Sequence, residues 1–354
     1  MTARTAAIIG IAVMSGAMPA ATPPLPPGAE IIAASAQGLS ADGAGLSVMT
    51  YNVKGLPWPM GIGRSGPLAR IGARLHALRQ AGRQPHVVLL QEAFTNEAKA
   101  IADVAGYPYR ADGPTQILAA ADPTDMAFLS EASMLAGEGM GKMSDSGLMI
   151  LSDYPIVAVR QAAFPVDACA GFDCLANKGM VLAFVRVPGS ATPVAILNAH
   201  LNARSASGVS IVRAFTAYGR QVAAMDAFLR ANLPAGTPLV LGGDLNVGRD
   251  RARRALMEAF AAHWTGSERL SRGVLRACAS GAGRCPPLSE DARKALEHNK
   301  DWQIAVDADG QGVAARRIAV PFGRETDGTM LSDHMGYVAY YAMPARRAQV
   351  AGNF

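Results

Sequence analysis

The chain has 354 residues, half of them hydrophobic and 17% charged, so it is long enough to bury a full core in one large domain. Beyond the N-terminus no stretch reaches the roughly 18 apolar residues that a transmembrane helix needs, which excludes an integral helical membrane protein. The formal net charge of +5 favours an anionic partner such as phosphate, nucleic acid or an acidic membrane surface, but charge alone does not choose among them.

The N-terminus has the pattern of a secretory signal peptide. Arg4 precedes a short apolar run, and small residues follow it. We predict a signal peptide at 1–21, a flexible leader at 22–45 and a single domain at 46–345. The mature protein is therefore expected to be secreted or periplasmic.

Because the chain is expected to be exported, its four cysteines are expected to form disulfides. They form two close pairs, Cys169 with Cys174 and Cys278 with Cys285. Neither pair is a CxxC motif or has clustered histidines that would indicate zinc. Of the three possible connectivities, we predict pairing within each short loop.

The first predicted elements place polar side chains at strand ends. Residues 46–53 alternate apolar and polar side chains and predict a strand that carries Asn52 near its end. A helix is expected over 67–82, with Gly82 as its C-cap. Residues 85–92 then predict a buried strand that ends on Glu92, and a further helix is expected at 95–105.

The middle of the chain predicts more strands than helices. Strands at 145–152 and 156–164, joined by a turn, indicate an antiparallel meander, and Asn177-Lys178-Gly179 opens a strand at 180–187. An apolar strand at 194–201 bears His200. The helix expected over 208–231 has the following inward stripe: Val209, Val212, Phe215, Val222, Met225 and Leu229.

The stretch 238–247 predicts a buried strand whose apolar run stops on a glycine pair. It is followed by Asp244 and Asn246, two positions apart and therefore on one side. The helix expected at 249–262 contains four arginines that form either a solvated face or a binding patch.

The last expected elements are a strand at 300–306, a hairpin turn at 307–312 and a closing strand at 335–341. The polar sequence Leu331-Ser332-Asp333-His334 precedes the closing strand.

Six segments together resemble the endonuclease/exonuclease/phosphatase superfamily. In chain order they read MTYNVKG, VVLLQEAF, NAHLNAR, LVLGGDLNV, KDWQIAV and LSDHMGY. The resemblance implies an α+β fold, a four-layer α/β sandwich in which two packed mixed β-sheets are flanked by helices. It also implies hydrolysis of a phosphodiester.

Within this resemblance, Glu92 and Asn52 are the expected ligands of Mg²⁺, with Mn²⁺ and Co²⁺ as alternatives, because hard cations prefer oxygen donors. His334 is expected to be the general base that deprotonates the attacking water, with Asp333 or another carboxylate holding its tautomer.

The remaining site residues surround the phosphate. The resemblance implies that Asp244 and Asn246 orient the water and the phosphate, and that His200 stabilises the transition state. Asp301 is expected to be a supporting carboxylate. Taken singly, a histidine or a carboxylate at a strand end is more often a packing residue or a solvated cap, and the joint pattern of the motifs favours the functional interpretation.

The substrate is less sharply indicated. The Asn177-Lys178-Gly179 step resembles the neutral sphingomyelinase branch, and Lys178 is expected to pair with the phosphate, or else to be a solvated turn residue. The chain has no aromatic-rich hairpin before His334, where only Phe322 stands, so a transient membrane contact stays open. Three alternatives remain: a sphingomyelin-type phosphodiesterase, a secreted nuclease acting on DNA, and an inactive binding protein. A monomer is expected.

Overall fold

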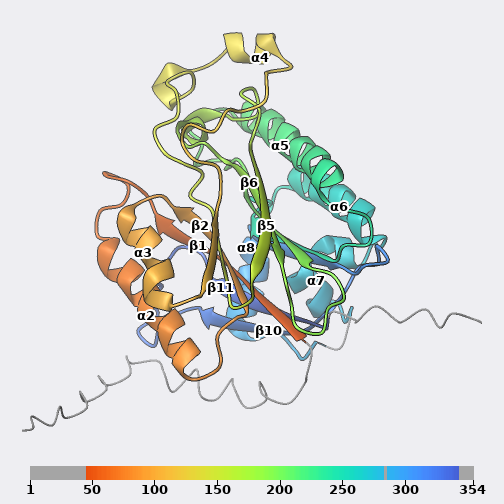
Figure 1. Cartoon of the computed structure of the whole chain (residues 1–354). Coiled ribbons are helices and arrows are strands. Elements are labelled where there is room, and N and C mark those ends of the chain that lie inside the picture. Colours follow the sequence, from red (N-terminus) through yellow and green to blue (C-terminus); the bar gives the residue numbers. More distant parts are fainter. Residues whose placement is uncertain (1–44, 283–284, 343–354) are drawn as a thin grey trace, which may run out of the picture.

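The computed structural model describes residues 45–282 and 285–342 (Figure 1). The predicted signal peptide at 1–21 lies outside these residues, as does the leader except for Gly45, which begins the first strand. Of the predicted domain, residues 343–345 also lie outside. In the part of the chain that the structure describes, no helix is long and apolar enough to cross a membrane.

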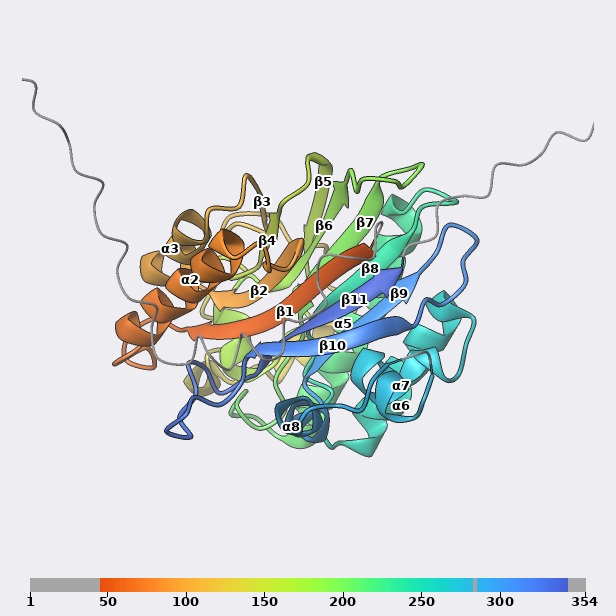
Figure 2. The ribbon, with the colours of Figure 1, turned by 90° about the horizontal axis from the view of Figure 1, so that it is seen from below.

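Two mixed β-sheets pack face to face (Figure 2). The six-stranded sheet has the order β10-β11-β1-β2-β4-β3, and the five-stranded sheet has the order β5-β6-β7-β8-β9. The strands of the first sheet are β1 (Gly45–Gly55), β2 (Val87–Ala93), β3 (Tyr109–Asp112), β4 (Met149–Ser152), β10 (Ala315–Phe322) and β11 (Gly336–Ala342). Those of the second are β5 (Ile156–Ala163), β6 (Gly179–Val185), β7 (Val194–His200), β8 (Leu239–Asp244) and β9 (Asp301–Val306).

Helices cover the outer faces of both sheets. In β1, Met49 and Tyr51 pack outward against α2 (Ser65–Gln80) and α3 (Asn96–Ala105), whereas Val48 points into the core between the sheets. This alternation is the two-residue period of a strand that is buried on both faces. The outer face of the second sheet packs against α5 (Ile211–Asn232) and α6 (Arg251–Thr265). The predicted four-layer sandwich is therefore confirmed.

Shorter helices complete the described chain. They are α4 (Met126–Ser130), α7 (Val274–Ala279), α8 (Glu290–His298) and the 3₁₀ turns η1 (Met134–Ala136), η2 (Gly171–Leu175) and η3 (Leu270–Arg272). Side chains of α7 and α8 join the core between the sheets.

The predicted antiparallel meander at 145–164 is wrong. β4 pairs with β2 and β3 in the first sheet, whereas β5 pairs with β6 in the second. The turn at 153–155 therefore carries the chain from one sheet to the other. All four residues of β4 are buried, as expected between two neighbouring strands, while β5 is a largely exposed edge strand.

The predicted inward stripe of the helix at 208–231 is partly wrong. The helix begins at Ile211, capped by the Ser210 hydroxyl, and this start leaves Val212 77% exposed. Val222, Met225 and Leu229 are buried as predicted. The rest of the buried face comes from Ala214, Ala217, Tyr218 and Gln221, whose small or polar side chains do not stand out as a hydrophobic stripe.

Both predicted disulfides are present. Cys169 pairs with Cys174 and Cys278 with Cys285, with Cα atoms 5.2 Å and 5.3 Å apart. The first bridge closes the η2 turn.

Candidate active site at the strand ends

Strand register brings the polar strand ends together. In the second sheet His200 lies opposite Asp244 in the parallel pair β7 and β8, and Asp244 lies opposite Asp301 of β9. In the first sheet Asn52 of β1 lies opposite Gln91 of β2, one residue before Glu92. Because parallel strands end at the same edge of a sheet, both sheets deliver their polar groups to one place.

The backbone is strained where the site is built. Four non-glycine residues among those described have positive φ, and three of them, Lys54 (52°), Glu92 (55°) and Asn246 (47°), flank the polar cluster. Left-handed backbone at such residues is disfavoured and persists where the surrounding structure enforces it. At each of these three positions, near the end of a strand, the left-handed backbone changes the direction in which the side chain points.

Asn52 joins the two sheets at the centre of the site. Its Nδ2 donates to Glu92 Oε1 at 2.9 Å and to Asp244 Oδ2 at 3.0 Å, while its Oδ1 accepts from the Lys54 backbone N–H. Burial raises the pKa of Glu92, and the Asn52 hydrogen bond only partly opposes this shift. The Asn52 amide thus presents its nitrogen, not its oxygen, to the carboxylates.

Two groups of three side chains have the composition of a metal site. Glu92, His200 and Asp244 form one group, and Asp244, Asp301 and His334 form the other. Asp244 belongs to both and is 2% exposed. Burial disfavours its carboxylate, but His334, His200 and the Asn52 amide outweigh burial and lower the pKa of Asp244. An ionised carboxylate beside Glu92 fits a divalent cation.

His334 is oriented by Asp301. Its Nδ1 lies 2.9 Å and 3.0 Å from the two carboxylate oxygens of Asp301, and its Nε2 lies 3.6 Å from Asp244 Oδ2. Burial lowers the pKa of an imidazole, but the two carboxylates outweigh burial and raise the pKa of His334 to about 10. Asp301 thus fixes the proton on Nδ1 and leaves Nε2 directed toward the site.

Asp333 does not hold this tautomer. Its side chain is 54% exposed and pairs with Lys54 Nζ at 3.1 Å. The neighbouring Ser332 donates to the carbonyl oxygen of Asn52, which ties the loop to β1. The loop before β11 thus directs Asp333 outward, while His334 is 5% exposed and lies in the site. Asp301 is the other carboxylate that the sequence left open.

Lys178 is buried, so the alternative of a solvated turn residue is wrong. It is 6% exposed and lies 3.1 Å from His200 Nε2, with Asp173 as its ionic partner. Burial and the Lys178 charge lower the pKa of His200 to about 3, so its imidazole is neutral at physiological pH. Asp173 also accepts from the Ala203 backbone, which places the η2 turn next to the site. In the sequence, only its place between paired cysteines distinguishes Asp173.

A buried arginine supports the loops around the site. The Arg253 guanidinium is stacked on Tyr218 and donates to the carbonyl oxygens of Asn202, Ala203, Ala214 and Asn246. Asn246 itself donates from Nδ2 to the Leu201 carbonyl. Arg253 is 1% exposed, so the basic run is neither a uniformly solvated face nor a continuous binding patch. Helical spacing alone did not reveal that this arginine faces inward.

A polar network between the sheets was also missed. Gln91 donates to Asn198 Oδ1 at 2.8 Å, and Asn198 donates to the backbone carbonyls of Leu90 and Met149. These contacts connect β7 of one sheet to β2 and β4 of the other directly behind the site. Both side chains are fully buried, so the network fixes the separation and alignment of the two sheets.

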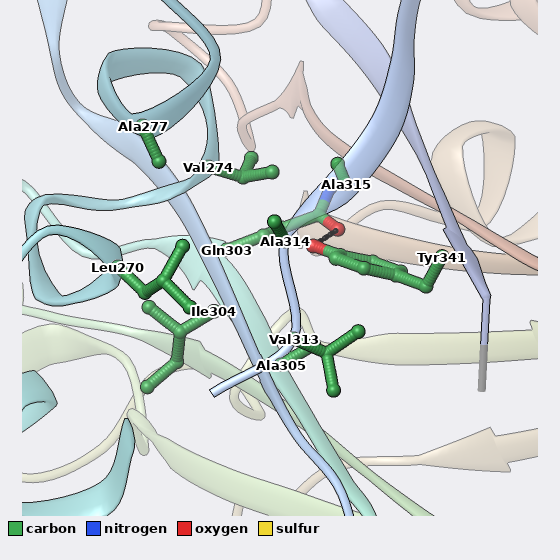
Figure 3. A pocket seen from close by; sticks show the side chains of 10 residues that line it. All are labelled: Leu270, Val274, Ala277, Gln303, Ile304, Ala305, Val313, Ala314, Ala315 and Tyr341. Atoms are coloured by element: carbon green, nitrogen blue, oxygen red, sulfur yellow. Dashed lines mark hydrogen bonds between the residues drawn. The ribbon is translucent and has the colours of Figure 1, made fainter. Parts of the chain in front are cut away.

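The pocket in Figure 3 is a different feature. It lies between β9, α7, β10 and β11 and is lined mainly by apolar side chains, together with Gln303 and Tyr341, which hydrogen-bond to each other. It lies further along β9 than Asp301 and has no charged side chain in its lining. It therefore has no group suited to acid–base catalysis or metal binding.

Known structures share this architecture. A beta toxin mutant from Staphylococcus aureus with bound magnesium ions is 18% identical with a TM-score of 0.57, covering 83% of this chain and 99% of its own. Sphingomyelinase C from Streptomyces griseocarneus is 24% identical with a TM-score of 0.54, covering 84% and 99%. D. rerio TDP2 complexed with single strand DNA product is 16% identical with a TM-score of 0.51, covering 85% and 99%. At these identities the likeness shows the fold alone.

Sequence comparison establishes the family. No curated protein sequence matches the chain. Residues 49–290, more than half of the chain, match the Endonuclease/Exonuclease/phosphatase family. The chain therefore belongs to the Endonuclease/Exonuclease/phosphatase family.

Proposed function

We propose that the chain is a secreted or periplasmic phosphodiesterase that hydrolyses a phospholipid head group of the sphingomyelin type with Mg²⁺ as its metal. The observation that carries the catalytic part is the convergence of Glu92, Asp244 and the Asp301–His334 pair from both sheets. The fold that the chain shares with Sphingomyelinase C supports the lipid part. Two disulfides support export.

The donor set fits a hard divalent cation. Glu92 and Asp244 offer carboxylate oxygens, and His200 lies within 4.0 Å of Glu92 and 3.6 Å of Asp244. Asn52 joins them through its amide oxygen only if the amide turns over from its present orientation. When bound, the cation supplies a Lewis acid for a phosphoryl oxygen and offsets the negative charge of the carboxylates.

His334 is the proposed base. Asp301 holds Nδ1, so Nε2 is the nitrogen that takes the proton from the attacking water when the ring is neutral; the raised pKa of His334 makes this the minor form at physiological pH until the charge of the neighbouring carboxylates is offset. The water oxygen forms the new bond to phosphorus, and the bond from phosphorus to the lipid alcohol breaks. Asp244, beside Nε2, and Asn246, at the mouth of the site, orient the water and the phosphate.

Positive charge for the phosphate comes from Lys178. His200 is neutral at physiological pH, so it offers the phosphate no charge. The Lys178 ammonium lies 3.1 Å from its ring. A phosphoryl oxygen placed there meets an ammonium group held in position by Asp173, which favours the negative charge of the transition state.

The placement of the arginines at 249–254 favours lipid over nucleic acid as the substrate. A DNA-binding groove needs several cations that face the phosphates. Arg253 is buried beneath the loops, and Arg204, which lies nearby, pairs with Asp250 at 2.8 Å. The basic run at 249–254 therefore does not supply a continuous row of exposed cations.

A substrate panel tests the proposal. The purified chain is assayed on sphingomyelin, phosphatidylcholine, and single- and double-stranded DNA, with Mg²⁺ or with excess EDTA. We expect Mg²⁺-dependent release of the phosphorylated head group from sphingomyelin, lost in EDTA and in His334→Ala. Cleavage of DNA without lipid turnover would establish the nuclease instead, and inertness on every substrate would contradict the proposed function.

A further inference from the structure

Large apolar side chains are exposed in a loop next to the site. Residues 56–63 directly follow β1, the strand that carries Asn52. Trp58 is 83%, Met60 71% and Ile62 72% exposed. Arg64 fastens the end of this loop by donating to the carbonyl oxygens of Val53 and of Leu331, close to His334. The loop therefore stands at the mouth of the site.

A second segment, residues 113–143, is apolar in the same way. Ile117 is 91%, Met126 69%, Met134 68% and Leu135 96% exposed. Figure 1 shows that α4, within this segment, projects beyond the sheets. We call residues 56–63 and 113–143 together the apolar rim.

The second segment is fastened beside Lys178. The Asn177 side chain donates to the carbonyl oxygens of Thr115 and Leu118 at one end of the segment. At its other end the Met143 backbone donates to the Leu175 carbonyl. Both ends thus lie against the turn that precedes Lys178, on the edge of the site.

The rim is held in shape by two ion pairs, of which the one between Arg213 and Glu138 is buried. Arg213 of α5 binds Glu138, which is 2% exposed, and Arg220 binds Asp125. Both guanidinium groups also lie over the Phe128 ring, 3.9 Å and 4.3 Å from its centre. The exposed side chains therefore project from an anchored segment and not from a frayed one.

Charge restricts the possible partner. Residues 56–63 contain no charged side chain, and residues 113–143 contain four acidic residues and one lysine. Glu138 and Asp125 are engaged with arginines. A chain of net charge +5 thus presents no positive patch on its rim, which disfavours nucleic acid and anionic lipid and suits a zwitterionic surface.

The shape of the rim favours a lipid surface over a protein. A stable protein interface needs roughly 800 Å² per partner with a closely packed core. The rim instead offers separate side chains, each largely free of its own chain. A lipid interface deforms around such side chains and accepts them without a complementary shape.

We propose that the apolar rim docks the enzyme on a zwitterionic phospholipid membrane and so brings the mouth of the site to the lipid head groups. This inference rests on the proposed function for its biological purpose. The docking itself is measurable without turnover.

Trp58 provides the probe. The chain has three tryptophans, and of these Trp302 is 3% exposed whereas Trp58 is 83% exposed. Vesicles of phosphatidylcholine with brominated acyl chains, in EDTA, should quench the protein fluorescence. Trp58→Phe should remove most of this quenching while binding, measured by co-sedimentation, persists.

Rim variants test the contribution of the second segment. The double variant Ile117→Ser, Leu135→Ser should weaken co-sedimentation with phosphatidylcholine vesicles by about tenfold or more, because each inserted side chain contributes through its buried apolar area. The matched control is Val157→Ser, an exposed apolar residue (44%) at the far end of β5, which should bind like the wild type. Thermal unfolding verifies that each variant is folded.

Three results would overturn the docking proposal. They are vesicle binding unaffected by the rim variants, binding that requires anionic lipid, and lipid-free self-association that the rim variants abolish, which would assign the rim to a second copy. Turnover of the water-soluble bis(p-nitrophenyl) phosphate separates the two proposals. If docking holds but no phosphodiester is hydrolysed, the proposed function fails and the rim remains a membrane surface.

Discussion

Replacing Asp301 by asparagine tests which carboxylate serves His334. The change keeps the shape of a side chain that is 8% exposed and removes the charge that lies 2.9 Å from His334 Nδ1. An asparagine that turns its NH₂ toward Nδ1 also forces the proton onto Nε2, which then accepts nothing from water. A positioned base contributes about 10²- to 10⁴-fold, so kcat should fall by that factor with little change in KM.

The matched control is Asp333→Asn. Asp333 is the immediate neighbour of His334 in sequence, but it is 54% exposed and pairs with Lys54, itself 35% exposed. Exposed pairs contribute about 0–1 kcal/mol, so kcat should change by less than about fivefold. Initial rates on a soluble phosphodiester measure both variants, and thermal unfolding verifies their folds.

The position of the His334 resonances in an NMR pH titration gives an independent readout. The carboxylates raise the pKa of His334 to about 10, and Asp301→Asn should lower it toward the ordinary value of 6.5. Asp333→Asn should shift it far less. The reasoning is refuted if Asp333→Asn loses activity while Asp301→Asn remains near the wild type.

Three further predictions concern metal, stability and pH. Glu92→Gln should raise the Mg²⁺ concentration needed for half-maximal rate on the order of tenfold or more, with an unchanged melting temperature in EDTA; equal metal requirements would contradict the ligand role. Arg253→Met should lower the free energy of unfolding in urea by about 3–5 kcal/mol, because buried carbonyl oxygens lose their donor; a change below 1 kcal/mol would show that water replaces the guanidinium. In EDTA, the raised pKa of His334 means that its ion pair stabilises the fold fully below pH 6.5 and that this stabilisation is lost as the pH rises through about 10. The difference in melting temperature between the wild type and His334→Gln should therefore become smaller over that pH range. A difference that stays constant with pH would contradict the ion pair.

The sequence by itself determined the strand ends of the site. Apolar runs that stop on a polar residue identified Asn52, Glu92, His200 and Asp244, because a strand buried on both faces leaves a recognisable local pattern. Six motifs in order determined the family and its four-layer fold. The short spacing within each cysteine pair also determined both disulfides.

Only the tertiary structure decided which groups are partners. The sequence places Asp333 beside His334, but strand register brings Asp301, 33 positions away, to the imidazole. The sequence likewise allows Lys178 to be either a solvated turn residue or a residue next to the site. In the structure Lys178 is buried against Asp173 and His200, next to the site. Local periodicity specifies the phase of each element, whereas contacts between elements depend on register and on which sheet a strand joins.

The same reason explains the arginine and the strands that were misassigned. Arg253 faces inward because α6 packs its first turns over the loops at 202–203 and 246, a contact between distant segments. β4 and β5 follow one another through a turn typical of a hairpin, yet they belong to different sheets because each finds its neighbours elsewhere in the chain. The strand propensity of a short stretch of residues carries no information about which strands will pair with it. The packing of the two sheets determines that pairing.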